Sequence, residues 1–256
     1  MPPSEHHDYI QSLERGLAVL RVFSHEHPTV TVSEAAELAG VTRATARRIL
    51  LTLERLGYVS SDGRRFAPAP RLLSIGYAYL SSLDLWDVAE PYMAELAETT
   101  RESCSAATLD GSEIVYVAHV DSNRVMGTAL RTGSRLPAYA TSMGRVLLAG
   151  LEPAALDAYL ATAKLRPLTS ATITHPGALR AVIDRARADG WCLVDQELEP
   201  GLRSIAAPIR DKRDRVVAAL NVSGNAGRVT PDGMRARFLP PLLHAAAMIS
   251  ETMARR

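Results

Sequence analysis

Two short helices joined by a tight turn are the sequence feature that most constrains how this chain can fold. The first follows a capping Thr31 or Ser33 and stops at Gly40. The second starts at Thr42, and its apolar residues recur at spacings of three and four as far as Leu56. This spacing places the apolar side chains on one helix face and leaves the opposite face for polar residues. The pattern is typical of a helix-turn-helix.

Two flanking elements extend the pattern. An amphipathic helix is predicted over residues 10–23, ahead of the helix pair. Behind the pair, the strand-like runs 58–60 and 65–67 flank Asp62-Gly63, and an Asp-Gly pair is a strong signal of a hairpin turn. A helix-turn-helix followed by a hairpin is a winged helix, and helix-turn-helix folds place their second helix in the major groove of DNA.

The net charge of the whole chain conceals a basic window. The sequence holds 29 Lys and Arg against 28 Asp and Glu, a net charge of +1, which by itself argues against nucleic acid as a partner. Residues 41–71 nevertheless carry seven arginines against two acidic residues, a net charge of +5, whereas the first forty residues are acidic. Because every basic residue except Lys164 and Lys212 is an arginine, ordinary solvated arginines are the alternative interpretation.

The placement of the basic residues favours DNA binding over that alternative. They fall on the outer face of the second helix, in its first turn and at the tip of the predicted wing. We therefore expect the helix to enter the major groove, and the wing to hold the DNA backbone or reach the minor groove. The expected DNA-binding residues are Thr42, Arg43, Thr45, Arg47 and Arg48 on the helix, and Arg64 and Arg65 on the wing.

A Leu- and Tyr-rich helix over residues 71–84 is predicted to link the winged helix, residues 1–70, to a second domain over residues 85–256. Its apolar side chains exceed what one helix face needs, so they pack either against a partner subunit or within their own chain.

In the second domain, sequential hairpins with helices grouped around them predict an α+β fold with an antiparallel sheet. The expected strands are 104–109, 113–120, 126–131, 191–195, 203–209 and 216–222, and the expected helices are 88–100, 141–151, 153–163, 176–189 and 231–255, the last with a break at Pro240-Pro241.

The second domain carries no recognisable catalytic or metal-binding motif. Zincin, nucleophile-elbow, Walker and dinucleotide-binding patterns are missing, so we expect no metal and no cofactor. His119, in a predicted strand, is expected to be half-buried and hydrogen-bonded rather than a base. The alternating acidic residues Asp195, Glu197 and Glu199 are interpreted as a solvated face. A binding domain is therefore favoured over a catalytic one.

The cellular setting and two rival functions follow from the same observations. No run of about 18 apolar residues is present, and the first residues lack a secretory pattern. The two cysteines are too far apart to suggest a metal knuckle or a disulfide framework, which predicts a cytoplasmic protein. One rival is an enzyme that acts on a small acid and has a regulatory winged helix. The other is a winged helix used only for protein association.

Strand periodicity brings small polar residues onto one face of the predicted sheet. Ser204 lies on one strand, while Asn221 and Ser223 share a face of its neighbour. These groups either meet a ligand or point to solvent. A helix that starts near Ser142 could hold a carboxylate with the N–H groups of its first turn, or it is simply capped by Thr141 or Ser142.

Four blocks of sequence resemble the IclR family of transcriptional regulators, and they occur in the order found in that family. The blocks are DYIQSLERGLAVLRVF at 8–23, TVSEAAELAGVTRATARRILLTLERLGYV at 31–59, RLPAYATSMGRVLLA at 135–149, and VDQELEPGLRSIAAPIRD at 194–211 with VVAALNVS at 216–223. The resemblance covers almost the whole chain. Within the family, the chain looks like the subgroup that responds to protocatechuate, 4-hydroxybenzoate or β-ketoadipate pathway compounds.

This resemblance implies a winged helix, a linker helix and a GAF-like effector domain, acting as a homodimer or a dimer of dimers. It implies regulation of an aromatic-acid catabolic operon, with operator DNA and a small carboxylic acid such as protocatechuate or 4-hydroxybenzoate as partners. Val194, Ser204 and Asn221 stand where the family's small-acid sensors have an acidic residue, a cysteine and a serine, which favours a larger, partly aromatic acid over glyoxylate or pyruvate. The implied effector-binding positions are Val125, Leu136, Ser142, Met143, Val194, Leu202, Ser204, Asn221 and Ser223, with Tyr139 beside them.

Overall fold

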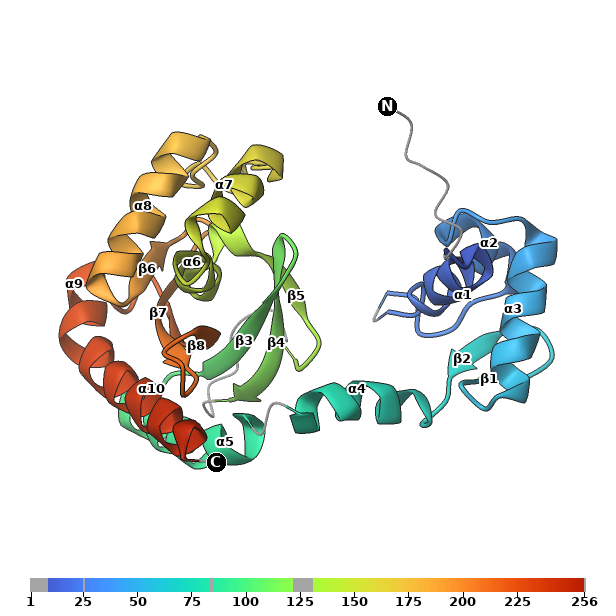
Figure 1. Ribbon diagram of the computed structural model, residues 1–256, viewed down its shortest axis with the longest axis horizontal. Helices are drawn as coiled ribbons and strands as arrows, with labels where there is room; N and C mark the ends of the chain where they lie inside the picture. Colours follow the sequence, from blue (N-terminus) through green and yellow to red (C-terminus); the bar gives the residue numbers. More distant parts are fainter. Residues whose placement is uncertain (1–8, 25, 83–84, 122–130, 256) are drawn as a thin grey trace. The chain divides into compact units, whose positions relative to one another are not determined.

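The chain folds into two compact units, Met1–Ser82 and Leu83–Arg256 (Figure 1). The computed structural model describes residues 9–24, 26–82, 85–121 and 131–255. The two units are taken one at a time below. Within the described residues, no helix is both long enough and apolar enough to cross a bilayer.

The N-terminal unit is the predicted winged helix-turn-helix followed by one further helix. Its elements are α1 (Gln11–Leu20), α2 (Val32–Leu38), α3 (Arg43–Arg55), β1 (Val59–Ser61), β2 (Phe66–Pro68) and α4 (Leu72–Ser82). Thr31 caps α2 in a capping box with Glu34, and the Thr42 hydroxyl caps α3. Gly40 and Gly63 adopt positive φ angles of 65° and 92°, as the turn between the helices and the tip of the wing require.

A small apolar core holds this unit together. The buried side chains come from every element except α4, and they include Val19, Val30, Ala35, Ala46, Leu50, Leu53, Val59 and Phe66. Of the apolar residues expected on one face of this helix, Ala46, Leu50 and Leu53 pack inward and Ile49 packs against the core, whereas Leu56, which caps the end of the helix, is 50% exposed. A bridge between Val30 and Phe66 attaches β2 to the chain just before α2, so the wing is fixed to the helix pair by backbone hydrogen bonds.

The C-terminal unit is built on one antiparallel sheet of six strands, in the order β5-β4-β3-β8-β7-β6. The strands are β3 (Cys104–Asp110), β4 (Glu113–Val120), β5 (Arg135–Pro137), β6 (Cys192–Asp195), β7 (Leu202–Arg210) and β8 (Val216–Asn225). The predicted α+β class is confirmed. The short edge strand β5 was not expected. The strand expected at 126–131 lies outside the described residues except for Arg131, which is not in a strand.

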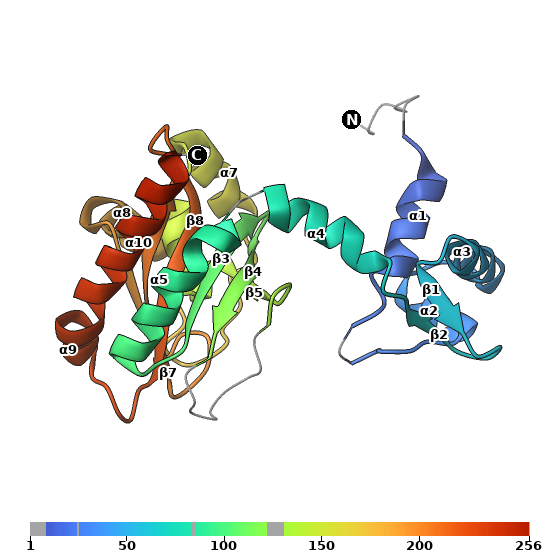
Figure 2. The ribbon, with the colours of Figure 1, turned by 90° about the horizontal axis from the view of Figure 1, so that it is seen from below.

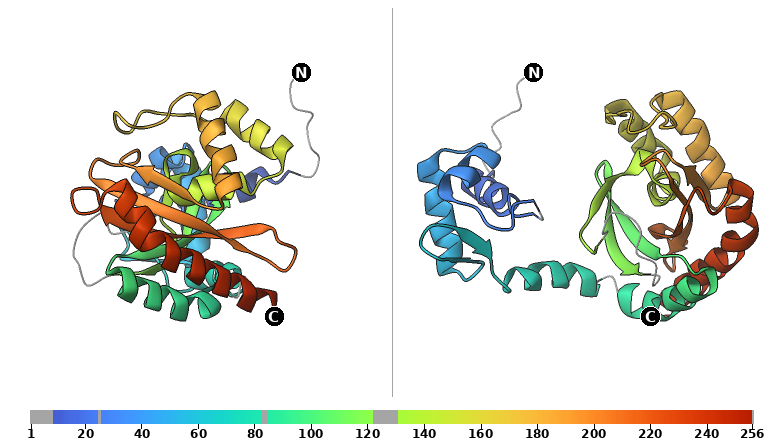
Figure 3. Two further views of the ribbon diagram at one scale, coloured as in Figure 1. Left: turned by 90° about the vertical axis from the view of Figure 1, so that its left-hand side faces the viewer. Right: turned by 180° about the vertical axis from the view of Figure 1, so that it is seen from behind.

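Helices cover both faces of this sheet. On one face α5 (Leu85–Thr100) and α10 (Leu239–Ala254) lie side by side (Figure 2). On the other, α6 (Ser142–Ala149) packs on the strands, and α7 (Pro153–Thr162) and α8 (Pro176–Asp189) lie on the same side (Figure 3). The strands β3, β4, β7 and β8 contact helices from both groups, so their alternate side chains enter two separate cores.

The C-terminal segment is one predicted helix that is interrupted in the structure. Residues Pro231–Gly233 form a short helix, α9, residues Met234–Phe238 form a π-helical segment, and α10 follows. Pro240 and Pro241 lack the N–H groups that would bond the preceding turn, and a widened turn at that point accommodates the loss. The predicted break is confirmed, a few residues ahead of the prolines.

Candidate functional site

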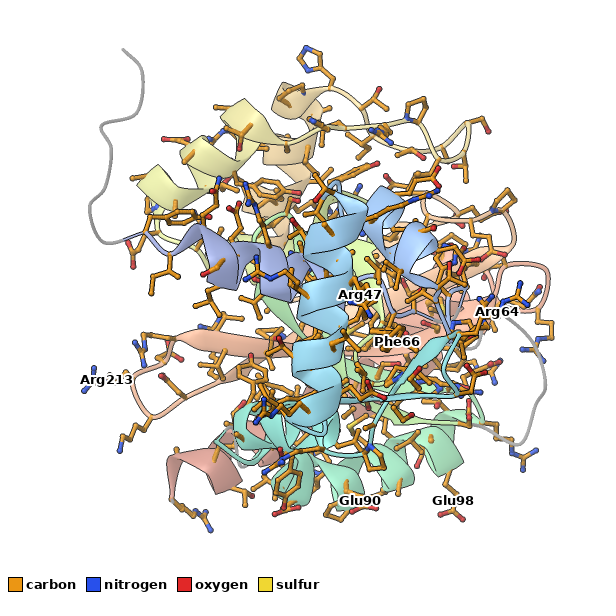
Figure 4. The ribbon with its side chains drawn as sticks, turned by 90° about the vertical axis from the view of Figure 1, so that its right-hand side faces the viewer. Arg47, Arg64, Phe66, Glu90, Glu98 and Arg213 are labelled. Carbon is orange, nitrogen blue, oxygen red and sulfur yellow. The ribbon has the colours of Figure 1, made fainter. Side chains whose placement is uncertain are left out.

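The outer face of α3 is basic and exposed. The side chains of Arg43, Arg47 and Arg48 face solvent, and among the described residues no carboxylate pairs with them. The hydroxyl of Thr42 accepts a hydrogen bond from the Thr45 amide at 3.2 Å and lies 2.9 Å from the Thr45 hydroxyl. Figure 4 shows Arg47 on this helix. The face therefore offers unpaired guanidinium groups at the position where a recognition helix meets DNA.

The two wing arginines lie in different environments. The carboxylate of Asp62 accepts hydrogen bonds from the amides of Arg64 and Arg65, which lowers the pKa of Asp62 and fixes the turn. The Arg64 side chain is exposed at the wing (Figure 4). The Arg65 guanidinium instead donates to the Thr29 hydroxyl at 2.8 Å, to the Thr29 carbonyl at 2.9 Å and to Glu34 at 3.2 Å. Arg65 thus ties the wing to the start of α2.

Arg71 has a related internal role at the end of the basic window. Its guanidinium donates to the carbonyl of Leu56, the last residue of the recognition helix region, at 2.8 Å, and lies over the Tyr58 ring at 5.7 Å from the centroid. Part of the +5 charge of the window is therefore used to hold the unit together.

In the C-terminal unit, small polar residues line the sheet face that α6 covers. Ser204 on β7 is the direct cross-strand partner of Ser223 on β8, and Asn221 pairs in register with Ala206. The predicted shared face is confirmed, since direct partners in an antiparallel pair project to the same side. Ser204 is 9% exposed and Asn221 4% exposed. The alternative of a solvent-exposed face is wrong.

These side chains are connected by hydrogen bonds that leave donors unused. The Ser142 hydroxyl on α6 donates to Ser204 Oγ at 2.9 Å, and Asn221 Nδ2 donates to Ser223 Oγ at 3.1 Å. Ser204 Oγ and Ser223 Oγ therefore each accept one hydrogen bond. Among the described residues, neither serine hydroxyl nor the second Asn221 N–H donates to a bonded acceptor.

The N-terminus of α6 ends beside this cluster. Thr141 is its N-cap, as one of the two interpretations held, and its hydroxyl accepts from the Gly144 amide at 3.1 Å. The backbone amides of Ser142 and Met143 lie between the cap and Gly144 in the first turn of the helix. Neither amide has a backbone or side-chain acceptor among the described residues. Both residues are buried. The first turn therefore adds two N–H groups to the hydroxyl and amide donors of the sheet.

Of the other expected effector positions, Met143, Tyr139 and Val194 belong to the apolar core beneath α6, and Leu136 packs against that core. Val194 is the direct partner of Ser204, Leu202 lies two residues before Ser204 on β7, and Met143 is buried on α6. Leu136, on the edge strand β5, is half-buried. The Tyr139 ring is buried, and its hydroxyl donates to the Arg166 carbonyl at 2.8 Å. Val125 lies outside the described residues.

Three polar residues beside the cluster were missed as site residues. Ser105 on β3 is the register partner of both Asn221 and His119, and its amide donates to Asn221 Oδ1 at 3.1 Å. His119 Nδ1 lies 2.8 Å from Ser105 Oγ, and His119 Nε2 lies 2.8 Å from Asp121 Oδ1. The expectation that His119 is half-buried and hydrogen-bonded is confirmed. Sequence parity alone could have placed Ser105 on a sheet face, but not beside Asn221.

A buried ion pair braces α6 against the loop after β6. Arg145 is 1% exposed and donates to both carboxylate oxygens of Glu197, at 2.7 and 2.5 Å, and to the Tyr139 carbonyl at 2.9 Å. Glu197 also accepts from the Ile173 amide at 3.0 Å. Asp195 pairs with the buried Arg203. The interpretation of this acidic stretch as a solvated face is therefore wrong for Glu197, whereas Asp195 is half-buried and Glu199 is exposed.

Metal ions in proteins are held by clusters of histidine, cysteine and acidic side chains. Among the described residues, no group of three or more histidine, cysteine or acidic side chains is placed to hold an ion. Cys104 and Cys192 are free and buried, and burial raises the pKa of these thiols to about 12 and about 11.

Families of known proteins match both the N-terminal and the C-terminal part of the chain. The family described as IclR helix-turn-helix domain matches residues 12–63, and the family described as Bacterial transcriptional regulator IclR C-terminal matches residues 77–251. The Pca regulon regulatory protein of Pseudomonas putida is 46% identical over 240 residues, which are 93% of this chain and 82% of that protein.

Two solved structures are similar to the chain. A transcriptional regulator from Rhodococcus sp. RHA1 has a TM-score of 0.84 and 49% identity, over 96% of this chain and 99% of its own. The inducer-binding domain of the PobR transcription factor from Acinetobacter, a double mutant in complex with 3-hydroxybenzoic acid, has a TM-score of 0.61 and 32% identity, over 64% of this chain and 96% of its own. The chain belongs to the IclR family of bacterial transcriptional regulators.

Proposed function

We propose that this chain regulates an aromatic-acid catabolic operon in the cytoplasm, binding operator DNA through α3 and the wing and a small carboxylic acid through its C-terminal unit. The IclR helix-turn-helix match supports the first half of the proposal. Relatives named for the Pca regulon and for an inducer complex with 3-hydroxybenzoic acid support the second. Because the family is one of transcriptional regulators, an enzymatic role is set aside.

The observation that carries the effector proposal is the surplus of donors at one buried place. The hydroxyl hydrogens of Ser204 and Ser223, one N–H of Asn221 and the first amides of α6 all lack bonded acceptors among the described residues. A buried polar hydrogen without an acceptor costs free energy. An ionised carboxylate is acceptor-only and offers about four lone-pair positions, so it satisfies this cluster as a hydroxyl or amide ligand could not.

The surroundings favour an aromatic acid. Met143 and Val194 border the donors with apolar surface, and Tyr116 on β4 lies on the same sheet face, as its pairing opposite Ala107 shows. Such walls bury the faces of a flat ring, while the charged end meets the donors. Protocatechuate and 4-hydroxybenzoate are the effectors that we propose on this basis.

The effector proposal is tested by calorimetry with these two acids. Wild-type protein is expected to bind at least one of them, and Asn221→Leu, which removes the amide with little change of volume, is expected to abolish binding. Ser204→Ala serves as the smaller change. The exposed Ser112→Ala, in the β3–β4 turn, is the matched control and should bind as wild type does. Wild-type affinity in both site variants would refute the assignment.

The DNA proposal is tested with Arg47→Ala. Loss of a guanidinium in the major groove is expected to weaken operator binding by about 1 to 3 kcal/mol while the affinity for the acid is kept. The control is Arg213→Ala, which removes an arginine that is also exposed, from the β7–β8 turn of the other unit (Figure 4). Gel-shift titrations in which the Arg47 variant retains wild-type affinity would contradict the proposal.

The partner proposal is a homodimer, or a dimer of dimers, that reads a pseudo-palindromic operator. Along α4, Leu73 is 74% exposed and Tyr77 is 69% exposed, with Ile75 and Tyr79 also exposed. Apolar side chains at this exposure favour the partner-subunit alternative over burial within the chain. Effector binding would then change the relative placement of two winged helices. Sedimentation of Leu73→Glu is expected to show weakened association, and an unchanged oligomeric mass would count against α4 as the interface.

A further inference from the structure

Ser105, His119 and Asp121 form a hydrogen-bonded relay that the carboxylate proposal does not use. Ser105 and His119 are direct partners on β3 and β4, on the sheet face that α6 covers, and Asp121 follows β4. Ser105 Oγ lies 2.8 Å from His119 Nδ1, and His119 Nε2 lies 2.8 Å from the Asp121 carboxylate. The imidazole is 18% exposed and the carboxylate 83% exposed. The relay therefore runs from an exposed carboxylate to the buried Ser105 hydroxyl.

The chemistry of the three groups fixes the direction of their hydrogen bonds. An ionised carboxylate only accepts, so His119 Nε2 carries a hydrogen and donates it to Asp121. In a neutral imidazole, Nδ1 is then an acceptor, and the Ser105 hydroxyl donates to it. With its hydrogen committed, Ser105 Oγ presents only lone pairs. It is an acceptor placed next to a cluster of unused donors.

The two ends of the polar face therefore have opposite requirements. The end at Ser204 and Ser223 lacks an acceptor, whereas the end at Ser105 can accept from a donor. Ser204 on β7 and Ser105 on β3 are two strands apart, which at about 4.8 Å per strand spacing puts them about 10 Å or more apart. One carboxylate cannot contact both Ser204 and Ser105. A ring with a carboxylate on one side and a hydroxyl on the other reaches both, through hydrogen bonds of about 2.7 Å.

We propose that the relay is a subsite that reads a hydroxyl group of the effector, with Ser105 as the specificity-determining residue and His119 and Asp121 as positioning residues. Such a subsite gives the hydroxylated acids proposed above an advantage over an aromatic acid that lacks the hydroxyl group. This inference rests on the proposed function, because it takes the carboxylate to be held at the other end. Asn221 joins the two ends, since its Oδ1 accepts from the Ser105 amide while its Nδ2 donates to Ser223.

The test compares matched acids that differ by one hydroxyl. Calorimetry of the full chain with 4-hydroxybenzoate, 3-hydroxybenzoate and benzoate is expected to show that wild type prefers one hydroxylated acid over benzoate by about tenfold. Ser105→Ala is expected to reduce that ratio to near one while benzoate affinity stays within about twofold. His119→Phe, which removes the acceptor and keeps an aromatic ring, should lower the ratio as well. Ser112→Ala, in the turn between the same two strands, should keep the wild-type ratio.

The ratio is the decisive readout because a merely structural role would weaken all the acids together. Equal affinities of wild type for the hydroxylated acids and benzoate would overturn the hydroxyl subsite and leave the carboxylate proposal standing. Equal losses for every acid in Ser105→Ala would overturn it too. Failure of wild type to bind any of the three acids would overturn the effector proposal itself, and the subsite with it.

Discussion

The recognition helix of the N-terminal unit and the core of the C-terminal unit use arginine in opposite ways. All but two of the 29 basic residues are arginines. In the N-terminal unit, Arg43, Arg47 and Arg48 extend from α3 into solvent, and among the described residues none has an acidic partner. In the C-terminal unit, Arg145 and Arg203 are buried and paired with Glu197 and Asp195. The charge of the first group is available to a phosphate or a guanine, whereas the charge of the second is neutralised within the fold.

The difference shows why a sum of charges cannot identify function. A guanidinium buried with a bidentate carboxylate is part of the scaffold, since removing one member leaves an uncompensated charge. An exposed, unpaired one contributes little to stability and remains free for a ligand. Arg65 combines both uses, because it belongs to the basic window and yet is bonded to Thr29 and Glu34. Substitution of a buried, paired arginine should therefore lower stability, whereas substitution of an exposed, unpaired one should weaken ligand binding.

The largest expected effect is that of Arg145→Met. Among the described residues, the Ile173 amide would be the one remaining partner of the buried Glu197 carboxylate, so the free energy of unfolding should fall by about 3 to 5 kcal/mol. Urea unfolding followed by circular dichroism measures this loss. The control is Arg185→Ala, which breaks the exposed pair with Asp189 and should change stability by less than about 0.5 kcal/mol. Similar small losses in both variants would show that the buried pair does not brace α6.

A second contrast between the units is the space around a glycine on a helix, and the expected change in stability is smaller. A Cβ at Gly144 would collide with the backbone of Ala138, where α6 meets the preceding turn. Gly144→Ala should therefore cost about 3 kcal/mol, although alanine favours helix. At Gly16 on α1 a Cβ meets nothing within 4 Å, and Gly16→Ala should stabilise by about 0.5 to 1 kcal/mol. Thermal unfolding of the two variants gives the signs, and a stabilised Gly144 variant would contradict the close approach.

The parts that could be predicted from sequence are those governed by local rules. The caps at Thr31 and Thr42 and the hairpin turn at Asp62-Gly63 depend on residues within a few positions, and they were located from the sequence. Strand parity likewise placed Ser204, Asn221 and Ser223 correctly, because side-chain alternation has a fixed period of two.

Contacts between distant segments could not be obtained in this way. Ser105 meets Asn221 through the register of two strands that are 116 residues apart in sequence. Glu197 was misinterpreted because its buried partner, Arg145, lies 52 residues away. The role of Arg65 depends on the wing folding back toward Thr29, 36 residues earlier. In each case the local pattern is compatible with a solvated side chain, and only the tertiary fold supplies the partner.

The smallest expected effect separates the two neighbouring wing arginines. Arg64 is exposed, so Arg64→Ala should remove one phosphate contact and reduce the slope of log K against log salt by about 0.9. Arg65 is engaged by Thr29 and Glu34, so Arg65→Ala should leave the slope unchanged and lower the free energy of unfolding by about 1 kcal/mol. Fluorescence anisotropy with operator DNA between about 50 and 200 mM salt measures the slopes. Equal reductions in both variants would mean that Arg65 leaves its internal partners to bind DNA, and the distinction between exposed and engaged arginines would then fail at the wing.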